Sequence, residues 1–108
     1  MTHKVRIEEA AHADIQEILS FIERRDGTKR ADKIEDKLYD LIESLSSMPD
    51  RGHRVREIQG YGITGFLEVV SRPYRIIYLI EKKTVYILLV VDGRRDFQSI
   101  LLDRILMQ

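Results

Sequence analysis

The stretch RPYRIIYLIEKKTVYILLVVDGRRD, residues 72–96, predicts two neighbouring β-strands. Its two apolar runs, Tyr74 to Ile80 and Thr84 to Val91, are rich in the β-branched and aromatic residues that favour strands. Only a short polar turn separates the runs, so we expect them to pair as antiparallel neighbours. A third run, Gly65 to Ser71, precedes them across the turn SRP and extends the predicted sheet.

Upstream of these strands the apolar residues follow a helical period. A first stripe runs from Ile15 to Ile22, and Gly27 ends that helix, with Thr28 as the expected N-cap of the next. The second stripe runs from Ala31 to Met48, where Pro49 stops it. The remaining predicted elements are a strand around Val5 and Ile7, a short strand at Arg54 to Ile58 within a Gly-rich loop, and a last helix with the stripe Phe97, Ile100, Leu101 and Ile105.

This order predicts an α+β fold, β-α-α-β-β-β-α, in one domain spanning residues 1–108. The expected architecture is an antiparallel sheet with an N-terminal helical hairpin and a C-terminal helix. We expect the helices to pack mainly on one face, which leaves the other face partly open.

Composition excludes several kinds of site. The chain has no cysteine and no pair of histidines at metal-binding spacing, so we expect no disulfide, no metal and no cofactor. No apolar run reaches the roughly 20 residues of a membrane span, and we expect a cytoplasmic protein that does not contact the membrane. Net charge is zero, yet residues 1–50 are acidic on balance and residues 51–108 are basic, which suggests one face suited to an anionic partner.

Arg75 is the conspicuous charge, because it stands inside an apolar strand. A guanidinium at such a position needs acceptors, and Glu57 and Glu68 lie on neighbouring segments. One interpretation is a structural ion pair such as Arg75–Glu68, which would fix the strand register. The other is a cation on the open sheet face, placed to hold a phosphate or an acidic side chain.

A basic pair, Arg94 and Arg95, follows the end of the next strand. Asp92 and Asp96 flank the pair and are its candidate counter-ions, and Asp96 is also the expected N-cap of the last helix. The pair therefore has two interpretations, a solvated turn or part of a binding surface.

His53 lies among the arginines of the flexible loop. A loop histidine is usually only exposed, but it becomes a proton donor where acids or phosphates converge on it. Its basic neighbours in sequence are Arg51, Arg54 and Arg56.

Taken together, the segments MPDRGHRVREI and FLEVVSRPYRIIYLIEKKTVYILLVVDGRRD and the closing helix resemble the RelE/ParE superfamily of bacterial toxins. The resemblance covers essentially the whole chain and is nearer ParE than RelE, notably in Gly52-x-x-Val55-x-Glu57 and in PYRIIY. It implies the toxin of a type II toxin–antitoxin module that arrests growth, neutralised by a cognate antitoxin. Within the superfamily, RelE-like members cut mRNA on the ribosome, whereas ParE-like members poison DNA gyrase.

A RelE-like ribonuclease would use Glu57, Arg75 and Arg95 as the catalytic set that the resemblance implies. The other expected side chains are missing, because the positions for basic residues, a tyrosine and a histidine are occupied by Phe66 and Glu68, by Leu101 and by Asp92. These departures favour the ParE-like alternative, which acts by binding and not as an enzyme.

The resemblance therefore implies a DNA gyrase inhibitor of the kind associated with plasmid stabilisation. Its expected partners are gyrase, the antitoxin, and operator DNA only through the antitoxin. The alternatives are the ribosome-dependent mRNA endoribonuclease and a degenerate, non-toxic co-repressor that binds the antitoxin. The candidate target-binding residues are Arg51, His53, Arg54, Arg75, Arg94 and Arg95.

Overall fold

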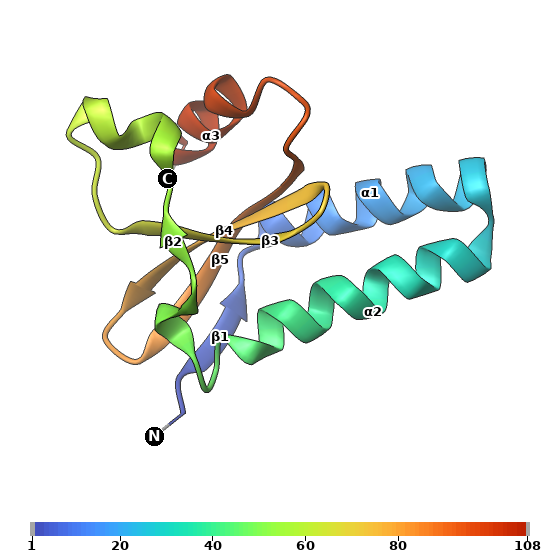
Figure 1. The fold of residues 1–108 in the computed structure, drawn as a ribbon, viewed down its shortest axis with the longest axis horizontal. Helices are drawn as coiled ribbons and strands as arrows, with labels where there is room; N and C mark the ends of the chain where they lie inside the picture. The colour runs from blue at the N-terminus through green and yellow to red at the C-terminus, as the bar shows by residue number, and fades with distance from the viewer. Residues whose placement is uncertain (1, 108) are drawn as a thin grey trace.

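The computed structural model describes residues 2–107 as five strands and three α-helices, joined in part by 3-10 turns (Figure 1). The strands are β1 (Lys4–Ile7), β2 (His53–Arg54), β3 (Phe66–Ser71), β4 (Tyr74–Glu81) and β5 (Thr84–Asp92). The helices are α1 (Glu9–Asp26), α2 (Thr28–Ser44) and α3 (Phe97–Leu106), and the 3-10 turns are η1 (Pro49–Arg51) and η2 (Arg56–Tyr61). The α+β fold and the order of its long elements agree with the prediction.

The strands form one sheet in the order β1-β5-β4-β3-β2. The pairs β2–β3, β3–β4 and β4–β5 are antiparallel, which confirms the pairing predicted from the short turns. The first strand differs, because β1 lies parallel to β5 along Lys4–Ile7. A parallel pair requires a long crossover, and here the helical hairpin and three strands lie between the two partners in sequence.

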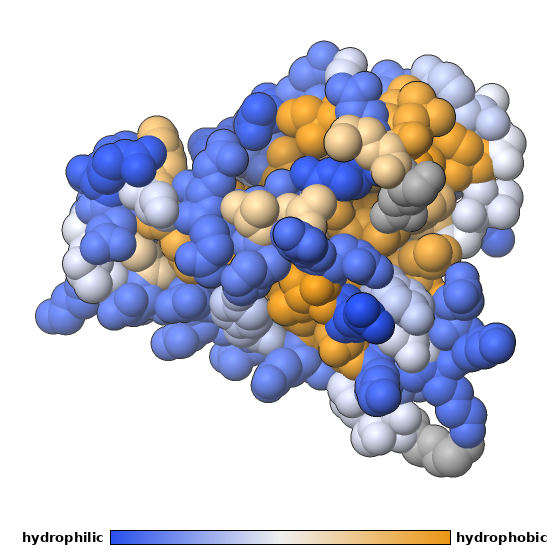
Figure 2. Space-filling model, turned by 180° about the vertical axis from the view of Figure 1, so that it is seen from behind, coloured by the Kyte–Doolittle hydropathy of each residue, from blue (hydrophilic) through white to orange (hydrophobic). Residues whose placement is uncertain are grey.

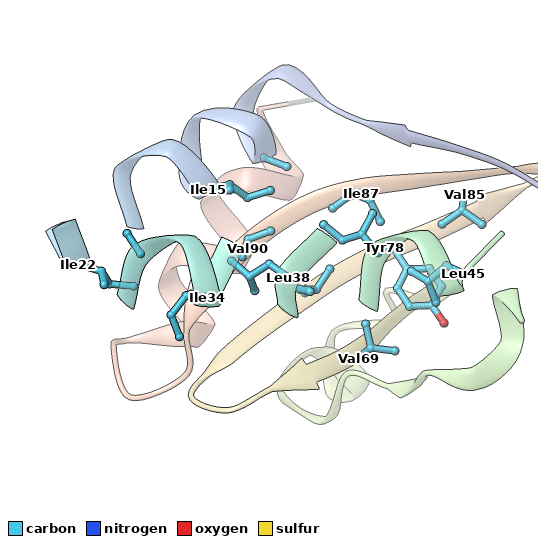
Figure 3. Close-up of a cluster of buried hydrophobic side chains, with 14 residues drawn as sticks. Ile15, Ile22, Ile34, Leu38, Leu45, Val69, Tyr78, Val85, Ile87 and Val90 are labelled. Atoms are coloured by element: carbon cyan, nitrogen blue, oxygen red, sulfur yellow. The ribbon is translucent and has the colours of Figure 1, made fainter. Parts of the chain in front are cut away.

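The helical hairpin covers one face of the sheet. Figure 1 shows α1 and α2 side by side, and their apolar stripes meet the side chains that alternate along β4 and β5. Ile15 and Leu38 from the hairpin pack with Ile76, Tyr78 and Ile87 from the sheet, all fully buried (Figure 3). This cluster is the larger of two cores, and it explains why neither helix is expected to be stable alone.

The opposite face is covered as well, by η2 and α3. Ile77, Leu89 and Val91 point to this side of the sheet and pack against Phe97 and Leu101 of α3. The expectation that helices lie mainly on one face, with the other partly open, was therefore wrong in its second part. In Figure 2, seen from behind, the end of the hairpin is mainly hydrophilic, whereas apolar side chains gather on the half that carries α3.

Two local predictions were also wrong. The expected strand at Arg54 to Ile58 is a two-residue strand followed by η2, because Val55 and Ile58, three residues apart, both turn into the second core. Thr28 is the first residue of α2 and not its N-cap; Gly27, with φ of 94°, is the N-cap. The predicted N-cap Asp96 is confirmed, since its side chain accepts from the Ser99 amide at 3.4 Å.

Candidate functional site

Arg75 lies between two carboxylates on the face of the sheet that η2 and α3 cover, which we call the second face. Its guanidinium donates to both oxygens of Glu68, at 2.6 Å from Nε and 2.8 Å from Nη2. It also donates to both oxygens of Glu57, at 2.8 Å from Nη1 and 2.9 Å from Nη2. The structural interpretation, an Arg75–Glu68 ion pair, is confirmed, and Glu57 joins it.

The register of the sheet explains this meeting. Glu68 of β3 pairs with Ile77 of β4, and Arg75 is two residues before Ile77, so both charged side chains lie on one face. Glu57 arrives from η2, where Ile58 is anchored in the core. Arg75, Glu57 and Glu68 therefore tie β4 to β3 and to the loop segment above them.

An aromatic ring completes the environment of Arg75. The Arg75 Cζ atom lies 3.5 Å from the centroid of the Phe97 ring, so the guanidinium stacks on the first residue of α3. Its side chain is only 16% exposed, and that of Glu68 only 5%. We refer to Arg75, Glu57, Glu68 and Phe97 as the Arg75 cluster.

The pKa values of the cluster follow from these contacts. Hydrogen bonding to Arg75 lowers the pKa of Glu57, against the opposing effect of its partial burial. Hydrogen bonding to Glu57, then to Glu68, raises the pKa of Arg75 still further above its already high ordinary value, although burial opposes this. The cluster is therefore a charged network in which one cation serves two anions.

His53 lies at the margin of the Arg75 cluster. Its Nδ1 atom is 3.7 Å from Oε1 of Glu68, and its side chain is 67% exposed. The loop beneath it is held by Tyr78, whose hydroxyl donates to the Pro49 carbonyl at 2.7 Å and accepts from the Gly52 amide at 3.0 Å. Burial raises the pKa of Tyr78, so its hydroxyl stays protonated and able to donate.

The other loop arginines point elsewhere. Arg51 donates from Nη1 to the Ser44 hydroxyl at 2.8 Å, at the end of α2. Arg54 and Arg56 are exposed, and within residues 2–107 neither shows a side-chain hydrogen bond or ion pair. Of the loop residues predicted for target binding, His53 approaches the Arg75 cluster, through Glu68.

The basic turn packs against the side-chain stem of Arg75 through Gly93, but its arginines make other contacts. Arg94 is held by Asp92, with contacts at 3.0 Å from Nε and 2.6 Å from Nη2, and this pairing lowers the pKa of Asp92. Arg95 is exposed, and among the described residues no interaction joins its side chain to Glu57 or Arg75. Of the hypothetical ribonuclease set, Glu57 and Arg75 are thus in contact, whereas Arg95 does not join them.

Arg94 and Arg95 instead line a groove of about 610 Å³ between α1, the end of β5 and α3. Its other arginines are Arg24 and Arg25 of α1 and Arg104 of α3. The sequence gave little indication of this grouping. Arginines such as Arg24 and Arg25 are favourable at the C-terminal end of any helix, so their presence there does not indicate a binding site. Arg104 already has a partner, because it forms a bidentate ion pair with Asp14 at 2.9 Å.

Within residues 2–107 no group of three potential metal ligands is found, and no helix is long and apolar enough to cross a membrane. The candidate site therefore has two parts. One is Arg75, whose guanidinium is already bonded to Glu57 and Glu68, and the other is the groove lined by arginines.

The sequence matches the family described as ParE toxin of type II toxin–antitoxin system, parDE, over residues 5–97. This chain belongs to the ParE toxin family. The match runs from the second residue of β1 to the first residue of α3, and so includes every member of the Arg75 cluster.

Solved structures show the same fold. This ParE-family toxin is similar to the chromosomal ParDE toxin–antitoxin system from P. aeruginosa, with a TM-score of 0.69 and 16% identity over 84% of this chain and 96% of that one. The RelBE2 toxin–antitoxin complex from Mycobacterium tuberculosis gives a TM-score of 0.62 and 23% identity, over 85% and 99%. A mutant of E. coli toxin RelE in the free state gives 0.50 and 16%, over 92% of each chain. No curated protein sequence is significantly similar to this chain.

Proposed function

We propose that this ParE-family toxin arrests growth by poisoning DNA gyrase, and that it does so by binding and not by its own catalysis. The observation that carries the proposal is the saturation of Arg75. Four of the five N–H groups of its guanidinium donate to Glu57 and Glu68, and one face of the guanidinium lies on Phe97.

A ribonuclease needs a cation that can reach the scissile phosphate. At Arg75 a phosphate would have to displace two carboxylates that are already bound bidentately, one of them almost fully buried. It would also be repelled by whichever carboxylate remained. These costs favour a structural role for Arg75 and leave target binding to the exposed basic residues.

The exposed basic residues that are candidates for target binding form two groups. One is the loop with Arg51, His53 and Arg54, and the other is the turn with Arg94 and Arg95 beside α3. We propose that one or both groups contact gyrase, and that Arg75 supports them indirectly by fixing η2 and α3.

The family match supports a cognate antitoxin as the second partner. The structures similar to this chain include two toxin–antitoxin pairs, ParDE and RelBE2. We propose that the chain acts as one toxin domain, residues 1–108, in the cytoplasm, and that it reaches operator DNA only through its antitoxin.

The proposal is tested with purified toxin, gyrase, ATP and relaxed plasmid. We expect supercoiling to fall as toxin is added and to recover when the cognate antitoxin is supplied. Full supercoiling in the presence of excess folded toxin would overturn the proposal.

One observation favours a second candidate, a ribosome-dependent endoribonuclease. Glu57 is in contact with Arg75, and His53 lies beside Glu68, so an acid, an arginine and an imidazole ring are within a small region. In this alternative Arg95 would have to approach the cluster on the ribosome. Cleavage of mRNA on purified ribosomes, lost in Glu57→Gln with folding retained, would establish this candidate and displace the first.

A further inference from the structure

Residues 49–54 carry three of the side chains proposed for target binding, and they are weakly attached to the rest of the fold. We call this segment the basic loop; it consists of η1, Gly52 and β2. Each of its residues is exposed or partly exposed, and β2 pairs with only two residues of β3. A segment with so few buried contacts is expected to open at a low free energy unless another group holds it.

Tyr78 of β4 holds the basic loop from inside the core. Its ring is fully buried among the apolar side chains that the hairpin and the sheet share (Figure 3). Its hydroxyl donates to the Pro49 carbonyl at 2.7 Å and accepts from the Gly52 amide at 3.0 Å. One phenol oxygen thus joins the two ends of the η1 turn, and it uses both its donor and an acceptor position to do so.

Gly52 allows the basic loop to lie directly on Tyr78 and β3. A Cβ atom at position 52 would lie 2.7 Å from the Glu68 carbonyl oxygen and 2.9 Å from Cε1 of Tyr78. The φ of Gly52 is −75°, which any residue can adopt, so glycine is needed here for space. This close approach places the next residue, His53, opposite Glu68 and so beside the Arg75 cluster.

We propose that Tyr78 is a positioning residue for target binding, whose hydroxyl holds Arg51, His53 and Arg54 in the arrangement that meets the target. Because Tyr78 is fully buried, it acts through the basic loop and not by touching the target itself. The inference rests on the part of the proposed function that assigns target contact to this loop, and it holds whether that target is gyrase or the ribosome.

Tyr78→Phe removes the hydroxyl oxygen and keeps the ring that fills the core. The Pro49 carbonyl and the Gly52 amide belong to partly exposed residues, so water replaces the lost partner once the loop moves outward. The main expected effect is therefore a released loop on a folded chain. Tyr39→Phe is the matched control, because Tyr39 is partly buried on α2 and its hydroxyl makes no hydrogen bond within residues 2–107.

Limited trypsin digestion tests how firmly the loop is held, without any target present. Cleavage after Arg51 or Arg54 requires the basic loop to open, whereas cleavage after Lys82 requires only the exposed turn between β4 and β5 to open. We expect Tyr78→Phe to raise the loop cleavage rate about tenfold, since two hydrogen bonds are lost, and to leave the rate after Lys82 unchanged. Global destabilisation would instead raise both rates together.

Growth arrest on expression without antitoxin measures the consequence for function, with the amount of toxin read by immunoblot. We expect Tyr78→Phe to require about ten times more toxin for the same arrest, and Tyr39→Phe to match the native chain. Arg51→Gln with Arg54→Gln should also weaken the toxin. Adding Tyr78→Phe to that pair should then cost less than about twofold more, because residues that act through one another are not additive.

The inference is overturned if Tyr78→Phe speeds cleavage after Arg51 and Arg54 no more than cleavage after Lys82. It is also overturned if Tyr78→Phe arrests growth as well as the native chain, or if it still costs the full factor when Arg51 and Arg54 are already replaced. Neither readout depends on which target the toxin attacks, so a negative gyrase assay would overturn the proposed function and leave this inference standing.

Discussion

Arg75 and Phe97 are stacked, with the guanidinium carbon 3.5 Å from the ring centroid. This contact joins the middle strand of the sheet to the first residue of α3. Glu57 and Glu68 accept hydrogen bonds from the same guanidinium, so η2, β3 and α3 all contact one side chain of β4. The stability of the second face is expected to depend on this residue more than on any surface ion pair.

Replacing Arg75 by alanine should destabilise the fold by about 2–3 kcal/mol. The change leaves Glu68 buried without its cation; the value is below the roughly 3–5 kcal/mol of a fully buried pair because Glu57 is about one-third exposed. Urea unfolding measures the loss. Arg75→Lys, which keeps the charge without the planar fork, should lose less, and equal stability of the alanine variant and the native chain would contradict the structural role.

Phe97→Leu should cost about 1–2 kcal/mol, from lost core volume and the lost cation–π contact. Phe21→Leu is the matched control, because Phe21 is half exposed and Arg25 lies 5.1 Å from its ring centroid. We expect the control to change the free energy of unfolding by less than about 0.5 kcal/mol. If the two variants had equal free energies of unfolding, the Arg75–Phe97 stack would not contribute measurably to stability.

The stability of the chain should fall in acid through Glu57. Folding lowers the pKa of this carboxyl below its ordinary value of 4.5, so at pH values between the two the unfolded chain binds more protons. Its contribution is therefore complete above the ordinary pKa and is lost as the pH drops through the folded one. Chemical unfolding between pH 3 and 6, in about half-unit steps, gives the free energy of unfolding as a function of pH. Its slope should be shallower in Glu57→Gln than in the native chain, and unchanged in the exposed Glu81→Gln.

Gly93→Ala should also destabilise the second face, by about 1–3 kcal/mol. A Cβ atom at Gly93 would lie 2.8 Å from Cδ and 3.1 Å from Cγ of Arg75, whose stem cannot move without breaking its hydrogen bonds. Gly60→Ala is the control, since a Cβ there meets nothing within 4 Å. Thermal unfolding of the pair decides the matter, and an unchanged Tm for Gly93→Ala would show that Arg75 is free to shift.

Local patterns were sufficient to predict most of the fold. The period-two runs and short turns that give β3, β4 and β5 are properties of adjacent residues, and so are the stripes of α1 and α2. The parallel pairing of β1 with β5 is not local, because it depends on how the hairpin folds back over the sheet. The predicted strand around Val55 and Ile58 was wrong, because alternation over a few residues does not distinguish a strand from a 3-10 turn.

The second core could have been predicted from one signal. Ile76, Ile77 and Tyr78 are consecutive and all buried, and a continuous apolar run indicates a strand covered on both faces. Within the candidate site, the Arg75–Glu68 pair followed from the need of a strand arginine for acceptors. Its stacking on Phe97 did not, because an apolar stripe shows that α3 is packed but not against which face. The gathering of Arg24 and Arg25 with Arg94 and Arg95 likewise depends on tertiary packing alone.

We propose that this toxin acts on gyrase and that Arg75 stabilises the fold. The most direct measurement adds folded toxin to gyrase, ATP and plasmid, and quantifies linear DNA released from trapped cleavage complexes. In parallel, the same preparation is added to translating ribosomes, and mRNA cleavage is mapped. We predict linear DNA that accumulates with dose and intact mRNA; cleaved mRNA without linear DNA would contradict the account and return Glu57, Arg75 and Arg95 to a catalytic role.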